Sequence, residues 1–140
     1  MTRSFLSLAL VAALTGCGSD ATDRADAPAA APAPGEPTQV TGILEEGDET
    51  LGSGEYVDSY TMTADEGQFI LVDVATGNFD PYVMIVSPSG EQTDVDDSES
   101  GDTSSTEATV FTTEAGEYTV MVTSYAPGET GVYNLTYSVE

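Results

Sequence analysis

One short segment, Tyr133-Asn134-Leu135-Thr136-Tyr137-Ser138-Val139, predicts the architecture of this chain. Apolar or aromatic side chains occupy every second position, and polar side chains occupy the positions between them. Because successive side chains of a β-strand point to opposite faces of its sheet, this period of two predicts a strand with one buried and one solvated face. Tyr133, Leu135 and Tyr137 are therefore expected in the core, and Asn134 and Thr136 at the surface.

The same alternation recurs along most of the chain, and turn signals such as Gly52-Ser53-Gly54 separate the repeats. The predicted strands are Val40–Leu44, Tyr56–Met62, Phe69–Ala75, Tyr82–Val86, Ala108–Thr112, Tyr118–Thr123 and Val132–Val139. No apolar stripe persists at helical spacing. These features predict an all-β fold, an antiparallel β-sandwich. Residues 38–140 have the length of a single domain with one core.

The alternation also predicts which side chains of the other strands face inward. The further core residues are Tyr60, Met62, Ile70, Val72, Val74, Val83, Ile85, Tyr118, Val120 and Val122. Residues between them on the same strands are expected on a solvated face, namely Ser59, Thr61, Asp73, Thr119 and Thr123.

The composition is strongly acidic. The chain has 25 Asp and Glu residues against two Lys and Arg residues and no His, which gives a net charge of −23. Arg3 and Arg24 both precede Thr38, so the predicted domain has 21 carboxylates and no cationic side chain. Such a surface repels nucleic acid and anionic lipid, and its counter-charges are salt, metal cations or a basic partner. Two alternatives explain the acidic composition: adaptation to a saline habitat, or a binding site for a basic ligand.

The composition argues against an enzyme. A Ser, Cys or Lys nucleophile needs a base partner, usually His or Lys, and the predicted domain contains neither. Paired carboxylates would still suit glycoside hydrolysis or aspartic-protease chemistry. With so many carboxylates some pairs must be close by chance, and no Trp is present to stack on a sugar. We therefore expect no catalytic residues and no enzymatic activity.

The N-terminal residues predict export. Arg3 precedes an apolar run from Phe5 to Leu14, which at about ten residues is too short for a membrane span of ~20. Leu14-Thr15-Gly16-Cys17 resembles the lipobox of bacterial lipoproteins, which implies a signal peptide over 1–16 and a lipid on Cys17. An ordinary secretory signal is the alternative. Because Gly18 stands where inner-membrane lipoproteins carry Asp, that resemblance favours an outer-membrane lipoprotein.

The segment 17–37 is predicted to be a disordered linker that follows the lipidated cysteine. It is rich in Ala and Pro and lacks the branched and aromatic side chains that would offset the entropy cost of ordering it. The predicted domain would therefore be tethered to the membrane through the lipid.

An acid-rich segment is the best candidate for a metal site. It contains Asp94, Asp96, Asp97, Glu99 and Asp102, and Asp80 is a further candidate ligand. Carboxylates on a flexible loop suit Ca²⁺, which accepts six to eight oxygen ligands in loose geometry. The alternative is a solvated loop without metal. Three tyrosines, Tyr56, Tyr82 and Tyr125, form a candidate aromatic patch for a sugar or peptide, with rim packing as the alternative.

Seven short pieces in order resemble the bacterial pre-peptidase C-terminal domain family. They are Gly42-Ile43-Leu44, Asp58-Ser59-Tyr60, Glu66-Gly67-Gln68, Phe79-Asp80-Pro81-Tyr82, Asp96-Asp97, Gly116-Glu117-Tyr118-Thr119-Val120 and Gly131-Val132-Tyr133-Asn134-Leu135. The resemblance implies a jelly-roll β-sandwich of the kind appended to secreted proteases, where it acts in substrate binding or secretion. This sequence departs from the pattern because its 140 residues include no protease segment.

These observations predict a non-catalytic, lipid-anchored, extracytoplasmic binding or adhesion module that Ca²⁺ stabilises. Its expected partners are the membrane, through the N-terminal lipid, and a polysaccharide or polypeptide ligand, but not nucleic acid. The alternative is a structural envelope lipoprotein or an accessory subunit of a separately encoded secreted enzyme.

Overall fold

Nine strands form two antiparallel sheets in the part of the chain that the computed structural model describes, residues 35–96 and 103–140. The strands are β1 (Thr38–Leu44), β2 (Glu49–Thr50), β3 (Tyr56–Ala64), β4 (Phe69–Thr76), β5 (Pro81–Val86), β6 (Gln92–Asp96), β7 (Ser105–Phe111), β8 (Gly116–Ser124) and β9 (Gly131–Val139). All seven predicted strands are present, with their ends shifted by three residues at most. Within these described ranges no helix is long and apolar enough to cross a membrane.

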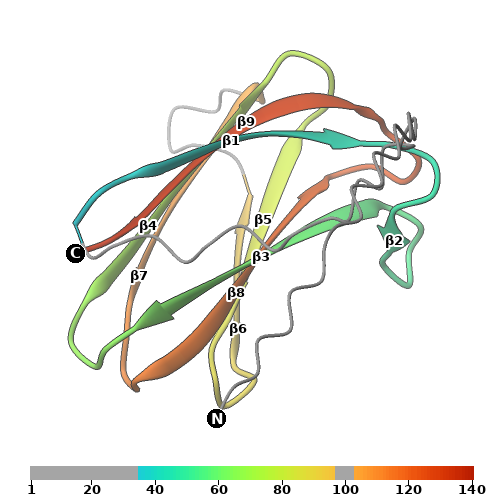
Figure 1. The fold of residues 1–140 in the computed structure, drawn as a ribbon. Helices are drawn as coiled ribbons and strands as arrows, with labels where there is room; N and C mark the ends of the chain where they lie inside the picture. The colour runs from blue at the N-terminus through green and yellow to red at the C-terminus, as the bar shows by residue number, and fades with distance from the viewer. Residues whose placement is uncertain (1–34, 97–102) are drawn as a thin grey trace, which may run out of the picture.

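The chain passes repeatedly from one sheet to the other. The four-stranded sheet has the order β1-β9-β4-β7, and the five-stranded sheet has the order β2-β3-β8-β5-β6. Apart from the two-residue β2, each sheet has four strands, and several strands that follow one another in the chain, such as β3 and β4 or β7 and β8, lie in different sheets, as in a jelly roll. Figure 1 shows the two layers and the adjacent course of β1 and β9. The predicted β-sandwich is confirmed.

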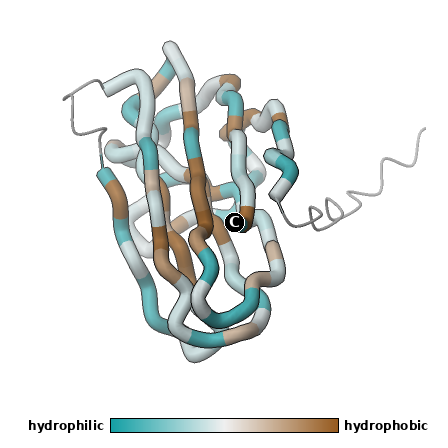
Figure 2. The backbone as a smooth tube through the Cα atoms, turned by 90° about the vertical axis from the view of Figure 1, so that its left-hand side faces the viewer, coloured by the Kyte–Doolittle hydropathy of each residue, from teal (hydrophilic) through white to brown (hydrophobic). Residues whose placement is uncertain are grey.

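The core lies between the two sheets. Every residue predicted for the core is buried except Tyr60, which is half-buried and packs against it. In Figure 2 hydrophobic residues lie along the strands, and hydrophilic residues occur both at the turns and on the strands. The prediction for Thr123 was wrong, because this residue is only 1% exposed. It lies between Val57 and Tyr82 in the register of β3, β8 and β5, and its hydroxyl donates to the carbonyl of Tyr56 over 2.6 Å.

The acid-rich segment does not begin as a flexible loop, which corrects the prediction for Asp94 and Asp96. Both residues belong to β6, which pairs with β5 along its whole length. The strand is held by its backbone pairing and by Val95, which lies opposite Val83 and packs against the core. A single inward apolar residue was too weak a signal to predict this strand from sequence.

A chain of hydrogen bonds joins the two sheets inside the sandwich. Tyr133 of β9 is fully buried, and its hydroxyl donates to Oδ2 of Asp58 on β3 over 2.5 Å. Since Tyr133 has a single hydroxyl proton, the hydroxyl of Tyr60 acts as the donor in the 2.6 Å bond between the two tyrosines. Burial, together with the hydrogen bonds to Asp58 and Tyr60, raises the pKa of Tyr133 far above its ordinary value.

Candidate functional site

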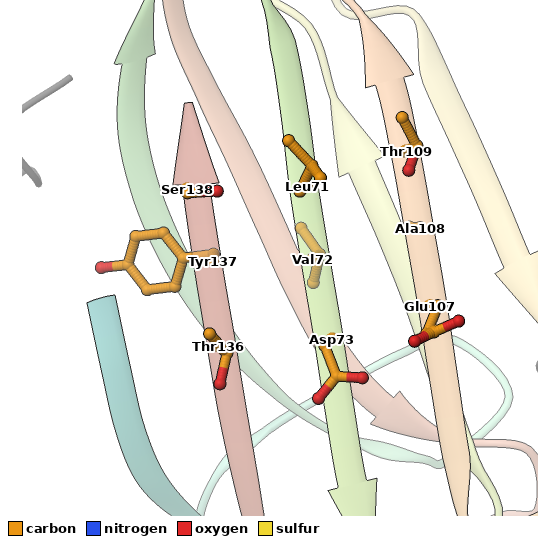
Figure 3. A pocket seen from close by; sticks show the side chains of 9 residues that line it. All are labelled: Leu71, Val72, Asp73, Glu107, Ala108, Thr109, Thr136, Tyr137 and Ser138. Carbon is orange, nitrogen blue, oxygen red and sulfur yellow. The ribbon is translucent and has the colours of Figure 1, made fainter. Parts of the chain in front are cut away.

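A concavity lies on the outer face of the four-stranded sheet. It has a volume of about 350 Å³, and its walls are side chains of β9, β4 and β7 that alternate with buried ones. We call it the trough, and we define it by Leu71, Asp73, Glu107, Thr109, Thr136 and Ser138. Figure 3 shows these side chains on three neighbouring strands, with Asp73 and Glu107 next to each other.

Two carboxylates face each other across strands in the trough. Asp73 of β4 lies directly opposite Glu107 of β7, with Thr136 of β9 on its other side. Such cross-strand neighbours have Cβ atoms about 4.5–5.5 Å apart, and like charges at this distance destabilise the pair. Residues 35–140 contain no Lys, Arg or His that could compensate these charges. This end of the trough therefore favours a cationic ligand.

The same pair is poorly suited to catalysis. A carboxyl group that acts as a general acid near neutral pH needs a site that excludes water, because burial is what keeps it protonated. Glu107 is exposed and Asp73 only half-buried. The trough therefore offers a binding surface and gives no support to the carboxylate-hydrolase alternative.

The outer face of this sheet continues beyond the trough into an aromatic pair. Phe69 and Phe111 lie opposite each other on β4 and β7, with ring centroids 5.2 Å apart. They are 47% and 54% exposed. Phe69 stands two residues before Leu71 on β4, and Phe111 stands two residues after Thr109 on β7. Exposed aromatic rings that contact each other are common at interaction sites. One face of the sandwich thus has an acidic end and an apolar end.

A second, smaller cavity opens at the end of the five-stranded sheet. It has a volume of about 240 Å³, and we call it the tyrosine pocket. Its lining includes Leu51, Ser53, Glu55, Tyr82, Thr123 and Tyr125. Of the three tyrosines predicted to form an aromatic patch, Tyr82 and Tyr125 meet here, whereas Tyr56 packs against the core. Two of the three tyrosines thus line one cavity, and their role in ligand binding stays a prediction.

The residues predicted to hold calcium are only partly within the described ranges. Asp97, Glu99 and Asp102 lie outside them, as does Cys17. Asp94 and Asp96 are exposed on β6, and the pKa of Tyr82 is raised by burial and then by these two charges. Among residues 35–96 and 103–140, no three acidic, histidine or cysteine side chains come close enough to hold a metal ion. The calcium site stays a prediction.

Comparison with known proteins gives a likeness to solved structures only. Neither a protein-family model nor a curated protein sequence matches the chain. The periplasmic inhibitor of g-type lysozyme, PliG, from Aeromonas hydrophila is 16% identical with a TM-score of 0.53, covering 74% of this chain and 86% of that protein. Its counterpart from Salmonella Typhimurium is 14% identical with a TM-score of 0.51, covering 74% and 87%.

A third solved structure bears on the family resemblance. It is the pre-peptidase C-terminal domain of the collagenase from Bacillus anthracis, which is 21% identical with a TM-score of 0.50, covering 74% of this chain and 88% of that domain. The shared feature is the fold. These identities are too low to transfer a ligand or an activity, so the chemistry of the site must come from the chain's own residues.

Proposed function

We propose that this chain is an exported, non-catalytic binding module that captures a cationic polypeptide on the trough. The observation that carries the proposal is the direct opposition of Asp73 and Glu107 in a concave face that has no cationic residue of its own. A ligand that brings a positive charge between the two carboxylates relieves their repulsion, so binding strengthens an arrangement that is unfavourable in the free protein.

A polypeptide suits the whole face better than a neutral polysaccharide. Lys and Arg side chains combine an apolar stem with a charged end, and Arg also stacks on aromatic rings. The face offers the matching sequence of groups, from the carboxylates through Leu71 to the exposed rings of Phe69 and Phe111. A neutral sugar would use the hydroxyl groups and the aromatic rings but would leave the opposed charges uncompensated.

The location is proposed from the sequence. The export signal and the Cys17 lipobox support a module held at the cell envelope by a lipid, with the outer membrane as the favoured destination. Solved structures with the same fold include periplasmic inhibitors of g-type lysozyme, whose target is an enzyme. This supports the idea that the sandwich presents a surface to another protein. Calcium stabilisation of the segment from Asp94 onward belongs to the proposal as well.

The test is calorimetric titration of the full chain with a lysine-rich decapeptide, a glutamate-rich decapeptide and a g-type lysozyme at physiological ionic strength. Of the two peptides, we expect the lysine-rich one to bind and the glutamate-rich one not to bind. Asp73→Asn combined with Glu107→Gln should weaken it about tenfold, or ~1.4 kcal/mol. The matched control, Glu46→Gln with Glu117→Gln, removes the same charge from exposed positions outside the trough.

The control variant should bind within about twofold of the unchanged chain, because dispersed surface charges each contribute little. Equal losses in the two double variants would mean that net charge alone attracts the peptide, and the trough would have no specific role. Binding of the lysozyme that depends on the trough would identify the class of partner. A chain that binds none of the three probes would support the structural-lipoprotein alternative.

A further inference from the structure

Three segments of the chain build the tyrosine pocket and hold it in a defined shape. The turn after β2 contributes Leu51, β5 contributes Tyr82, and the segment directly after β8 contributes Tyr125. Backbone bonds fix these segments: the amide of Leu51 donates to the carbonyl of Glu55, and that of Tyr125 donates to the carbonyl of Asp80, each over 2.9 Å. The pocket walls are therefore positioned by main-chain bonds before any ligand arrives.

A buried carboxylate lines this pocket. Glu55 is only 8% exposed, and its Oε2 accepts a hydrogen bond from the hydroxyl of Ser53 over 2.6 Å. No side chain from residue 35 to residue 140 can offer it a positive charge. Taking an ionised carboxylate out of water is costly unless a cation accompanies it. A cation that pairs with the Glu55 carboxylate must therefore come from a ligand.

The other walls match a cation on an apolar stem. Leu51 supplies an aliphatic surface, and the rings of Tyr82 and Tyr125 supply π-faces that attract an ammonium group within about 6 Å. Negative potential from Asp94 and Asp96 reaches the Tyr82 hydroxyl. At about 240 Å³ the pocket is smaller than the ~300–1,000 Å³ of sites for drug-sized ligands, so it suits one side chain or one small amine.

From this geometry we propose that the tyrosine pocket binds a single alkylammonium group, with the ammonium on Glu55 and the alkyl stem between Leu51 and Tyr125. The group belongs either to a lysine side chain or to a small free amine. The pocket lies on the five-stranded sheet, and the trough lies on the four-stranded sheet. The inference therefore does not rest on the proposed function of the trough.

The experiment follows amide shifts of the ¹⁵N-labelled full chain while n-butylamine or its uncharged isostere n-butanol is added at pH 7. We expect saturable shifts at Leu51, Thr123 and Tyr125 with n-butylamine, and at least about tenfold weaker binding of n-butanol, or ~1.4 kcal/mol. Equal affinities for the two compounds would overturn the proposal. Tighter binding of Nα-acetyl-lysine amide than of n-butylamine would identify a polypeptide as the source of the group.

Variants separate the pocket from general charge effects. Glu55→Gln should weaken n-butylamine about tenfold, whereas Glu117→Gln, the same change at an exposed position on β8, should leave affinity unchanged. Because Glu55 is buried, Tyr125→Leu serves as a second variant at a 64% exposed residue, and it should also weaken binding. If Glu117→Gln and Glu55→Gln have equal effects, or if Tyr125→Leu has none, the proposal is wrong. Asp73→Asn with Glu107→Gln should leave this titration unchanged.

Discussion

Gly42 lies so close to Tyr133 that a Cβ atom on Gly42 would stand 2.2 Å from the Cζ atom of the tyrosine ring. Gly42→Ala should therefore destabilise the fold by about 1–3 kcal/mol, the usual cost of overpacking a core. Gly52→Ala is the control, because an added Cβ there meets nothing within 4 Å. Urea unfolding of both variants measures the difference, and equal stabilities would mean that the Tyr133 ring moves aside without cost.

Tyr133 also predicts a loss of stability in alkali. Burial and then the hydrogen bonds to Asp58 and Tyr60 raise its pKa above the ordinary 10.0. Below pH 10 both the folded and the unfolded chain keep the Tyr133 hydroxyl proton, so Tyr133 makes its full contribution to the free energy of unfolding. Above pH 10 only the unfolded chain loses it, and the free energy of unfolding should fall by up to ~1.4 kcal/mol per pH unit.

Urea unfolding between pH 8 and pH 11 tests this slope. Tyr133→Phe should make it shallower, although Tyr82 and Tyr137, whose pKa values are also raised chiefly by burial, leave part of it in place. Tyr125→Phe, at a 64% exposed residue, is the control and should keep the full slope. At neutral pH Tyr133→Phe should cost about 1–3 kcal/mol, because the hydrogen bond from the Tyr133 hydroxyl to Asp58 is lost. If Tyr133→Phe leaves the alkaline slope unaltered, Tyr133 does not cause the loss of stability above pH 10.

The net charge of −23 predicts stabilisation by salt. Folding concentrates the carboxylates, and raising NaCl from 0.1 M to 1 M shortens the Debye length from about 10 Å to about 3 Å. The melting temperature should therefore rise with NaCl, by roughly 4–8 °C for each kcal/mol of repulsion removed. Scanning calorimetry measures the shift, and sucrose at equal osmolality controls for hydration. A melting temperature that does not respond to NaCl would show that the charges are too dispersed to matter.

Calcium should act differently from bulk salt if the acid-rich segment binds it. At fixed ionic strength, Ca²⁺ at a hundredfold excess over its dissociation constant would stabilise the fold by ~2.7 kcal/mol. Mg²⁺ should give less, because it demands tighter octahedral geometry. Asp96→Asn with Asp97→Asn should erase the difference between the two ions in thermal melts, whereas Glu45→Gln with Glu46→Gln should preserve it. Identical melts with the two ions would leave the segment as solvated charge.

Lipidation at Cys17 is tested in cells. Cys17→Ser should abolish labelling by a fatty-acid probe and release the protein from membrane fractions, because the single cysteine is the expected lipid attachment site. Ser19→Ala, a neighbouring change that keeps the cysteine, should retain both properties. A Cys17→Ser protein that stays with the membranes would place the anchor elsewhere.

The strands and the core could be predicted because the period of two is a local property of the sequence. Tyr118, Val120 and Val122 show it plainly, and all three are buried. The strand β6 could not be predicted, since its exposed carboxylates hide the one inward residue, Val95. Thr123 was misassigned because the neighbouring strands β3 and β5 bury it, and the pattern within its own strand β8 does not indicate this.

The candidate sites depend on register, which the sequence does not reveal. Asp73 could be assigned to a solvated face, but nothing in its neighbourhood indicates that Glu107 lies opposite it on β7. The tyrosine pocket could be predicted in part, because Tyr82 and Tyr125 were expected to share an aromatic patch. Glu55 was missed. The only available signal is an acid placed directly after a glycine turn and before a strand, which also describes many surface residues.

The pairing of β1 with β9 has a consequence for how this sandwich can be joined to other proteins. Thr38 lies opposite Tyr137, and the amide of Gly35 donates to the carbonyl of Val139 over 2.9 Å, so the chain enters and leaves the described fold at one corner (Figure 1). Neighbouring ends are what circular permutation and insertion into a host loop require. The sandwich could therefore be inserted as a unit into an exposed turn of an unrelated protein without separating β1 from β9.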